Sequence, residues 1–332
     1  MMEFQTLGER VYRLARYSDV RAALEDTRFV HWTMRDGRGS PFHTAVDRWL
    51  DAMDPSNASP VRELLLQHIG AAAMRRHRER VAATAGALLA GIEGDTVIDC
   101  ASGFAAPLVH TLLAEILGVD ACRQEQFAAT VGPLCESIPA LMFAQDADAG
   151  SNAALASWMA FLDEVDAGDG MVNALRRLDP PLAPGDVTAF AAMLVYAAFV
   201  NVTTFIALAI WTVGRDPQQW DELGAAPARI APALEELLRR LSPLRAVHLV
   251  TRETIVGADI VVPPGSSVFA DLAAANHDDE RSGHHLAFGA GALACIGAAL
   301  ARMQSEIALS TLVSGFMPSA PLDFPLLAIR RR

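Results

Sequence analysis

Residues 285–302 read HLAFGAGALACIGAALAR, a glycine-rich turn that leads through one cysteine into an alanine-rich run. Gly289 and Gly291 stand on either side of one alanine, and glycine permits positive φ and a close approach to the backbone. The run over residues 298–312 has helical periodicity, so Cys295 precedes a predicted helix N-terminus. The unpaired N–H groups and the dipole there favour a thiolate over a thiol. Residues 297–299 are glycine and alanine, so a flat ligand can lie beside the sulfur. A thiolate beneath a planar ligand is the arrangement in which a cysteine ligates haem iron.

This stretch resembles the haem-binding loop of the cytochrome P-450 superfamily, whose pattern is Phe-Gly-x-Gly-x-His-x-Cys-x-Gly. Only the histidine of that pattern is replaced, by Leu293. The other members of the pattern are Phe288, Gly289, Gly291, Cys295 and Gly297. The resemblance implies that Cys295 ligates the iron of haem b and that the other members surround the cofactor. The alternative interpretation of Cys295 is a buried structural cysteine in a glycine-rich turn.

A second motif lies upstream, where Glu236 and Arg239 stand three residues apart in a predicted helix and share one face. Such a pair is usually a solvated salt bridge. With the Ser-Pro that follows, it resembles the family's Glu-x-x-Arg motif. The resemblance implies a buried structural pair, which forms hydrogen bonds to a loop next to the thiolate loop, the loop of residues 285–297 that contains Cys295. The family's third member of this network lies in a longer meander. Only residues 280–284 remain of that meander here, and Arg281 is the only candidate substitute.

Residues 187–214 contain no charged side chain and are numerous enough to span a bilayer. Polar residues within this run, such as Thr188 and Asn201, and the charged chain on both sides favour a buried central helix instead. The family has such a helix, which crosses the distal face of the haem. The resemblance therefore implies the cytochrome P-450 fold, mainly α with a small β region, with haem between this helix and the helix after Cys295.

Residues 216–220 resemble the family's His-Pro-Glu-Gln turn after this helix, and counting back from Pro217 without gaps places the family's acid–alcohol pair on Val200 and Asn201. In the family that pair organises water and protons for splitting dioxygen. Valine cannot carry a proton, and asparagine forms hydrogen bonds but relays a proton less easily than a hydroxyl. A shift of the alignment by two residues places Thr203 and Thr204 there instead, still without an acid. The alternative for Asn201 is a polar residue bonded within the core.

Arg62 lies in the first turn of a predicted helix that begins at Pro60 and is capped by Ser59. The segment resembles the family's Asp-Pro-Pro-x-His-Thr-x-x-Arg, whose histidine and arginine bind a haem propionate, with Ala58 in place of the histidine. Taken alone, Arg62 reads as an ordinary solvated helix charge. His248 falls near the place of a propionate-binding arginine of the family, although a lone histidine is more often structural.

The remaining periodicity predicts amphipathic helices over residues 71–92, 103–117, 120–140 and 152–166. Residues 34–46 are rich in Gly, Arg, Ser and Pro and predict a loop, whereas residues 251–265 predict a small sheet with a Pro-Gly turn. The basic cluster at residues 75–80 indicates a solvated helix face. Its alternative interpretation is a docking patch for an acidic electron-transfer partner.

The chain has 332 residues, of which 52% are hydrophobic, and a formal net charge of −12. All 27 basic residues are arginine. An acidic chain without a basic tract is a poor nucleic-acid ligand, which excludes that class. The four cysteines have neither close pairs nor metal-type spacing and indicate a reducing compartment. The first 17 residues show neither a signal peptide nor a membrane anchor, so we expect a cytoplasmic protein without a membrane partner.

The resemblance covers about residues 9–312 and implies one domain, residues 1–332, with a shortened N-terminus, meander and C-terminal tail. It implies an oxidoreductase, a haem-thiolate monooxygenase that oxidises a small organic molecule in bacterial secondary metabolism. Because no flavin or iron–sulfur motif is present, we expect electrons from a ferredoxin or flavoprotein reductase. One alternative uses peroxide or substrate-assisted proton delivery, since the acid–alcohol pair is missing. The other is a haem-free, degenerate member that acts as a binding or recruitment domain.

Overall fold

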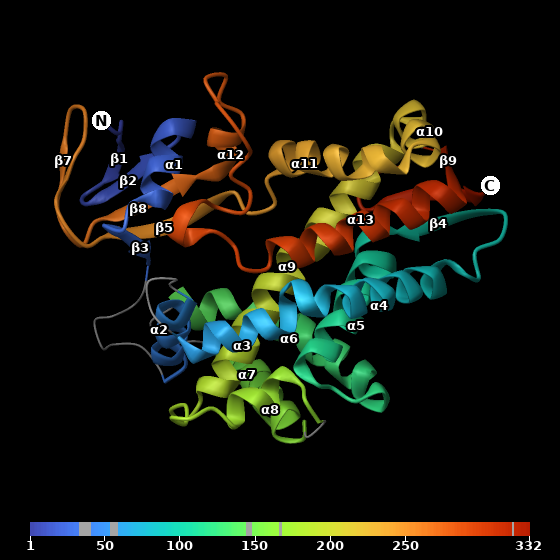
Figure 1. The fold of residues 1–332 in the computed structure, drawn as a ribbon, viewed down its shortest axis with the longest axis horizontal. Helices are drawn as coiled ribbons and strands as arrows, with labels where there is room; N and C mark the ends of the chain where they lie inside the picture. The colour runs from blue at the N-terminus through green and yellow to red at the C-terminus, as the bar shows by residue number, and fades with distance from the viewer. Residues whose placement is uncertain (33–40, 54–58, 144–147, 166–167, 321) are drawn as a thin grey trace. The chain divides into compact units, whose positions relative to one another are not determined.

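Helices form most of the described chain, and its strands gather in small sheets (Figure 1). The computed structural model describes residues 1–32, 41–53, 59–143, 148–165, 168–320 and 322–332. The chain divides into two units, residues 1–34 with 54–58 and 235–298, and residues 35–53 with 59–234 and 299–332. The mainly α composition with a small β region confirms the fold class that the sequence predicts.

Five strands of the first unit form one sheet. They are β1 (Gln5–Gly8), β2 (Val11–Leu14), β3 (Phe29–His31), β5 (Ala246–Thr251) and β8 (Ser267–Asp271). Their order across the sheet is β1-β2-β8-β5-β3, so the N-terminal strands pair with strands from the last third of the chain. The β2–β8 pair is parallel and the other three pairs are antiparallel.

Two helices of the first unit, α1 (Tyr17–Glu25) and α12 (Leu272–Asn276), contact each other and the sheet. Val20 of α1 is fully buried in one core with Leu249 and Val268 of the two central strands. Full burial of a Val or Leu side chain contributes about 1.5–3 kcal/mol. This apolar layer therefore holds the helices against the sheet.

The small sheet predicted over residues 251–265 is present as a short hairpin, and the predicted Pro-Gly turn lies after its second strand rather than between its strands. Strand β6 (Ile255–Val256) pairs antiparallel with β7 (Val261–Val262). Gly265 has a φ of 75°, and its N–H donates to the carbonyl oxygen of Thr251 at 2.6 Å. A φ in this range favours glycine, which explains the Pro-Gly pair at the turn.

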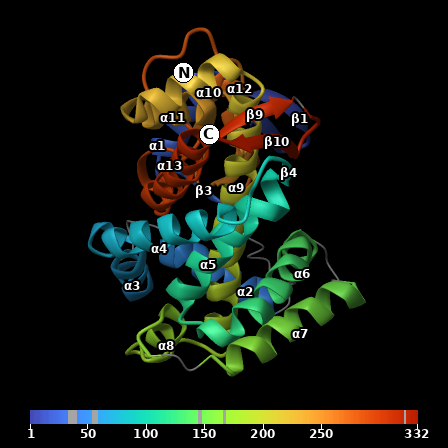
Figure 2. The ribbon, with the colours of Figure 1, turned by 90° about the vertical axis from the view of Figure 1, so that its right-hand side faces the viewer.

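The second unit is organised around α9 (Asp186–Gly214), a helix of 29 residues. Figure 2 shows α2 (Pro41–Met53) and α5 (Ala106–Leu117) beside it, and α6 (Gln124–Phe143) contacts it as well. A helix that is apolar nearly all round has to be buried on most of its surface. The central helix predicted from the charge-free run is thereby confirmed.

Other elements of the second unit surround this arrangement. Its further helices are α3 (Pro60–Ile69), α4 (Ala71–Leu89), α7 (Ala149–Asp163), α8 (Met171–Arg176), α10 (Pro217–Ala225) and α13 (Ala298–Gly315). A three-stranded antiparallel sheet has the order β4-β10-β9 and consists of β4 (Asp95–Asp99), β9 (Phe316–Ala320) and β10 (Leu326–Arg331). The division between the units falls inside α11 (Ile230–Leu241) and one residue into α13.

Two helical segments of the described chain are long and apolar enough to cross a membrane, Cys100–Leu117 and α9. In the most apolar 18-residue window of each, 56% and 50% of the residues are buried inside the protein. Burial of this extent is what the core helix of a helical domain shows. Helix α9 packs against α2, α5 and α6. This packing explains why so long a helix is apolar.

The first turn of α9 is fastened to α2 by an ion pair. The carboxylate of Asp186 is 3% exposed and accepts a hydrogen bond from Arg48 Nε at 2.7 Å. Its second oxygen accepts from the backbone N–H of Ala183 at 3.1 Å. An acidic side chain at a helix N-terminus also interacts favourably with the helix dipole. The buried carboxylate thus has a cation and a further hydrogen-bond donor, which together offset the cost of burying its charge.

One element prediction is wrong and the others are confirmed within a few residues. Residues 34–46 are not a loop throughout, because α2 begins at Pro41; residues 33–40 lie outside the described residues. Helix α3 begins at Pro60, and the Ser59 side chain accepts from the N–H of Arg62, as the capping pattern predicts. The four predicted amphipathic helices correspond to α4, α5, α6 and α7.

His110 is a polar residue in the core of the second unit. Its ring lies on α5 and stacks on Phe199 of α9, with ring centroids 4.3 Å apart and an interplanar angle of 7°. Phe127 of α6 contacts it edge-on at 6.0 Å. The ring Nε2 is buried without a hydrogen-bond partner among the described residues. This burial lowers the pKa of His110 to about 4.

The lowered pKa of His110 predicts a loss of stability in acid. Above pH 6.5 the ring is neutral in both the folded and the unfolded state. Below that pH the unfolded state binds a proton that the folded state refuses until about pH 4. The free energy of unfolding then falls by about 1.4 kcal/mol per pH unit in this window. We expect His110→Phe, which preserves the aromatic stack, to flatten this slope in urea titrations between pH 7 and pH 4.5. An unchanged slope in the variant would contradict the assignment.

Candidate functional site

The loop before Cys295 depends on two glycines with positive φ. Gly289 has a φ of 71°, and a Cβ at this position would lie 2.5 Å from the carbonyl oxygen of Leu293. Gly291 has a φ of 57°, and a Cβ there would lie 2.8 Å from Cα of Glu25. Both conformations and both close approaches exclude other residues. The glycines of the motif therefore shape the loop through the backbone.

Cys295 is exposed, which overturns its alternative interpretation as a buried structural cysteine. Its N–H donates to the carbonyl oxygen of Phe288 at 2.8 Å, and its own carbonyl accepts from the N–H of the first residue of α13 at 3.3 Å. The cysteine therefore lies at the start of that helix, as predicted. Burial raises the pKa of Cys100 and Cys135 to about 12 each, so these two thiols are inert core residues.

The surroundings of Cys295 fit a planar cofactor ligated by a thiolate. Ala294 and Ala299 are exposed beside it, and a Cβ added at Gly297 would lie 3.9 Å from Sγ. Phe288 is half-buried and its ring lies 6.2 Å from that of His285. A soft thiolate suits iron, and the small neighbours leave room for a macrocycle. The residues present thus fit haem.

Midway along α9, one stripe of the helix is less buried than the rest. Ala197 and Thr204 are exposed, Asn201 between them is half-buried, and this spacing puts all three on one face. The Asn201 amide Nδ2 donates to the carbonyl oxygen of Ala197 at 3.0 Å, which is its one side-chain hydrogen bond among the described residues. Half-buried Val200 adds no polar group. Thr203 Oγ1 is buried without a described partner. The catalytic roles of these residues stay predictions.

The two predicted propionate ligands differ in character. Arg62 is half-buried and makes no ion pair with a described carboxylate, so its charge is available to an anion. His248 is stacked between Trp32 and Phe269, at centroid distances of 5.1 and 4.5 Å, and its Nε2 is 3.1 Å from Ser267 Oγ. Burial lowers the pKa of His248, which makes it a neutral hydrogen-bonding group. Ala58 lies outside the described residues.

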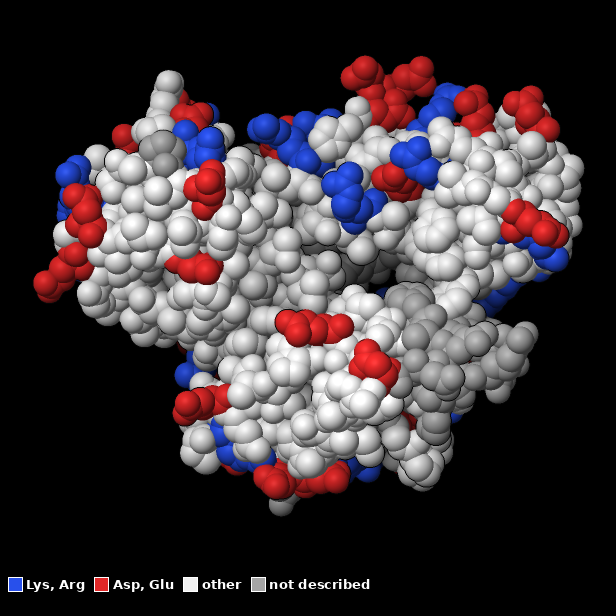
Figure 3. All heavy atoms as spheres, turned by 180° about the vertical axis from the view of Figure 1, so that it is seen from behind, with Lys and Arg blue, Asp and Glu red and all other residues white. Residues whose placement is uncertain are grey.

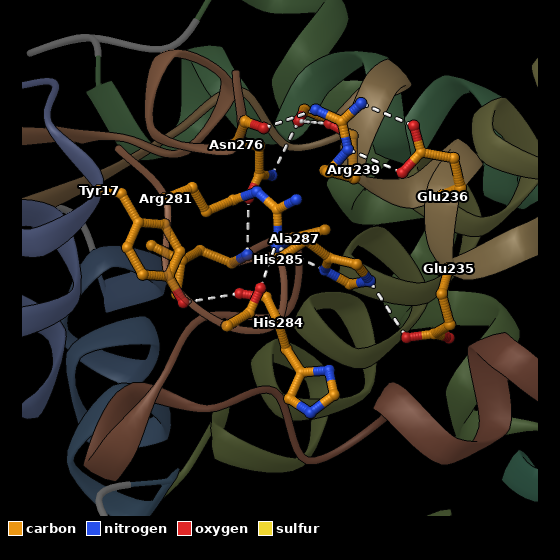
Figure 4. A network of polar contacts seen from close by, with 12 residues as sticks. Tyr17, Glu235, Glu236, Arg239, Asn276, Arg281, His284, His285 and Ala287 are labelled. Atoms are coloured by element: carbon orange, nitrogen blue, oxygen red, sulfur yellow. Dashed lines mark hydrogen bonds and ion pairs between the residues drawn. The ribbon is translucent and has the colours of Figure 1, made fainter. Parts of the chain in front are cut away.

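The structure brings Glu236 and Arg239 together as predicted (Figure 4). Arg239 Nε and Nη2 donate to the two carboxylate oxygens of Glu236 at 2.8 and 2.6 Å. The prediction that the pair is buried is wrong, because the Glu236 side chain is 53% exposed. The burial of the pair is unequal, since the Arg239 side chain is only 22% exposed. Hydrogen bonds from Arg239 hold the pKa of Glu236 below its usual range.

Arg281 does not take the place of the family's third network member by an ion pair. Among the described residues its guanidinium donates to the carbonyl oxygen of Gly283, and it acts on Glu236 only weakly, through its charge. The third partner is Asn276 instead, whose carbonyl oxygen accepts from Arg239 Nη1 at 2.8 Å. The contact is made by the backbone carbonyl of Asn276, so the residue type gives no sign of it in the sequence.

Known proteins resemble this chain along nearly its whole length. The family model described as cytochrome P-450 matches residues 276–325, which contain the Cys295 loop. A Streptomyces sp. protein, cytochrome P-450 105C1, is 30% identical over 319 residues, which cover 90% of this chain and 80% of that protein.

The chain belongs to the cytochrome P-450 family.

Further relatives and solved structures agree with this assignment. Cytochrome P-450 107B1 of Saccharopolyspora erythraea is 26% identical over 350 residues, covering 95% of this chain and 85% of that protein. Nocardicin C N-oxygenase of Nocardia uniformis subsp. tsuyamanensis is 27% identical over 346 residues, with coverages of 96% and 85%. The fold is shared with P450BioI, solved with an acyl carrier protein, at a TM-score of 0.80, 20% identity and coverages of 100% and 94%. The fold is also shared with the open cytochrome P-450 EryK from S. erythraea, at a TM-score of 0.74 and 23% identity, covering 97% of this chain and 90% of that chain.

This P-450 is therefore an enzyme, a haem-thiolate monooxygenase in which a cysteine ligates the haem iron. Members of the family act on small molecules and receive electrons from redox partners. The curated relatives named above are two cytochromes P-450 and one oxygenase. Their names favour neither of the two alternatives, a haem-free recruitment domain and a peroxide-dependent enzyme.

Three arginines of the basic cluster of this P-450 on α4 pair with neighbouring carboxylates. Arg76 and Arg80 both pair with Glu115, at 3.4 and 2.9 Å, and Arg78 pairs with Glu306 at 3.3 Å. On the face shown in Figure 3, acidic and basic side chains are likewise interspersed. The contacts favour the interpretation of this cluster as a solvated, ion-paired helix face.

The unequal exposure of the two network residues predicts unequal mutational effects. Arg239→Ala removes a donor from the buried carbonyl of Asn276 and should lower the free energy of unfolding by about 1–3 kcal/mol. Glu236→Gln removes one charge from a half-exposed pair and should cost less than about 1 kcal/mol. Urea denaturation of both variants checks this order, with Glu222→Gln of the exposed Arg229–Glu222 pair as the control. Equal losses in both variants would show that the pair acts as one buried unit.

Proposed function

We propose that this P-450 inserts oxygen into a small organic molecule of bacterial secondary metabolism, with haem b held by the thiolate of Cys295. The observation that carries the proposal is the exposed Cys295 at the start of α13, behind a loop shaped by Gly289 and Gly291. The similarity to nocardicin C N-oxygenase and to cytochrome P-450 107B1 supports the metabolic setting. We further propose that residues 1–332 act as a single domain.

Bound haem supplies the redox-active iron, to which a thiolate donates electron density. The contribution of this chain at the sulfur is positioning. The hydrogen bond from the Cys295 N–H to Phe288 fixes the cysteine backbone, and the dipole at the N-terminus of α13 stabilises the thiolate. Arg62 would supply a charge, and neutral His248 a hydrogen bond, for binding the haem propionates.

Proton delivery in this P-450 has to differ from that of relatives with an acid–alcohol pair. Asn201 Nδ2 is engaged with its own helix, which makes the amide oxygen the group that orients a water molecule. Thr204, one turn away on the same stripe, adds an exposed hydroxyl that can hold and pass a proton. Val200 excludes water from its side of the stripe. We assign the proton route to water between these two polar groups.

We place the enzyme in the cytoplasm with an external electron donor, a ferredoxin or a flavoprotein reductase. The absence of any flavin or iron–sulfur motif from the sequence supports an external donor. The four cysteines, all without disulfide bonds, support a reducing compartment. The interspersed charges of the face in Figure 3 and the net charge of −12 support neither a nucleic-acid nor a membrane partner.

The assignment of Cys295 predicts the visible spectrum of the protein. The reduced protein with carbon monoxide should show a thiolate-type haem spectrum at one haem per chain, and Cys295→Ser should lose it. Cys122→Ser, which changes the other exposed cysteine, is the matched control and should keep it. Purified protein that stays colourless after reconstitution with hemin would overturn the proposal and restore the recruitment domain.

The missing acid predicts imperfect coupling of reductant to product. Water held by Asn201 delivers protons less readily than an acid–alcohol pair, so the parent should release peroxide during reductant-driven turnover. Val200→Glu combined with Asn201→Thr should lower the peroxide released per reductant consumed. Ala197→Ser, on the same stripe, controls for added polarity alone. Tight coupling in the parent would show that another proton route exists and that Val200 and Asn201 are wrongly aligned.

A further inference from the structure

Four consecutive residues, 284–287, are each fastened just before the thiolate loop (Figure 4). The carbonyl oxygen of His284 accepts from the Tyr17 hydroxyl at 2.7 Å, and the N–H of Leu286 donates to Asn276 Oδ1 at 2.6 Å. These contacts come from α1 and from α12. A third contact joins the side chain of His285, the residue between His284 and Leu286, to Glu235 of α11.

Both ring nitrogens of His285 have partners. Nδ1 accepts from the backbone N–H of Ala287 at 3.2 Å, and Nε2 lies 3.1 Å from Glu235 Oε2. Because Nδ1 acts as an acceptor, the ring proton is on Nε2, which donates to the carboxylate. The His285 side chain is 6% exposed and that of Glu235 is 42% exposed. The neutral imidazole thus satisfies both contacts in a nearly buried position.

The next hydrogen bond along the chain reaches the cysteine. His285 holds the N–H of Ala287, and the carbonyl oxygen of the following residue, Phe288, accepts from the N–H of Cys295. A rotation of the backbone at 287–288 therefore moves the acceptor that fixes Cys295. Among the described residues, the guanidinium of Arg281 donates to the carbonyl oxygen of Gly283 and forms no hydrogen bond with residues 284–288, so it does not take part in fixing this segment.

We propose that His285, oriented by Glu235, is a positioning residue for Cys295. The pair fixes the backbone of residues 285–287, and the carbonyl oxygen of the next residue, Phe288, accepts from the N–H of Cys295. The role of Cys295 as the iron ligand rests on the function proposed above, whereas the fixing of the loop by His285 does not. The two can therefore be tested separately.

The first test uses the protein without haem. Hydrogen–deuterium exchange of peptides covering residues 284–296 should be about tenfold faster in His285→Phe, which keeps the ring volume and loses both contacts. His285→Gln places an amide donor near Glu235 and should restore most of the protection. His277→Phe, an exposed histidine bonded to its own helix, is the matched control and should change nothing there. Peptides from α5 report whether the whole fold has loosened.

The second test uses the holoprotein. In His285→Phe and Glu235→Gln, part of the reduced carbon monoxide complex should convert from the thiolate-type to the thiol-type spectrum, with less conversion in His285→Gln. Glu235→Gln retains the shape of a half-exposed side chain and therefore guards against a His285→Phe variant that does not fold. Local exchange and spectra like the parent's in both variants would overturn the positioning role and leave the proposed function standing. A parent without a thiolate-type spectrum would overturn the proposed function, while the exchange experiment would still decide on His285.

Discussion

The buried side chain of Asn276 is the contact on which the arrangement of the first unit's site depends. It is fully inaccessible, and its amide accepts from Leu286 N–H at 2.6 Å and donates to Ser242 Oγ at 3.0 Å. Its backbone carbonyl accepts from Arg239. Leaving any of these buried groups unpaired would cost about 1–3 kcal/mol. Helix α12, the end of α11 and the segment before the thiolate loop are thereby held in one mutual arrangement.

The elements that the sequence predicts well carry local signals. The charge-free run became α9, and Ser59 with Pro60 marked the start of α3 to the residue. Gly289 and Gly291 could be placed in the thiolate loop because the positive φ of both positions leaves few alternatives to glycine. In each case the physical cause lies within a few residues of the signal, so no knowledge of the rest of the chain was needed.

The elements that the sequence concealed depend on distant contacts. Helix α2 was hidden by a loop-like composition, and it is held by contacts across the chain, Trp49 on Phe190 at 5.5 Å and Arg48 on Asp186. The exposure of Glu236 depends on which parts of the folded chain cover it, and the spacing of Glu236 and Arg239 does not report that. The pairing of Glu235 with His285 joins residues 50 positions apart, and neither residue type nor spacing announces it. Tertiary packing overrides local preference in all three cases.

The contact of Gly291 with Glu25 has a consequence for how the chain is made. The end of α1 leaves no room for a side chain at Gly291, and the hydroxyl of Tyr17 in the same helix holds His284. On the ribosome, α1 emerges well before its partner loop, because most of the described chain lies between them. Residues 59–234 of the second unit are released in between and can pack as they appear. The thiolate loop is therefore shaped after those residues have been released, against a helix that was synthesised well before it.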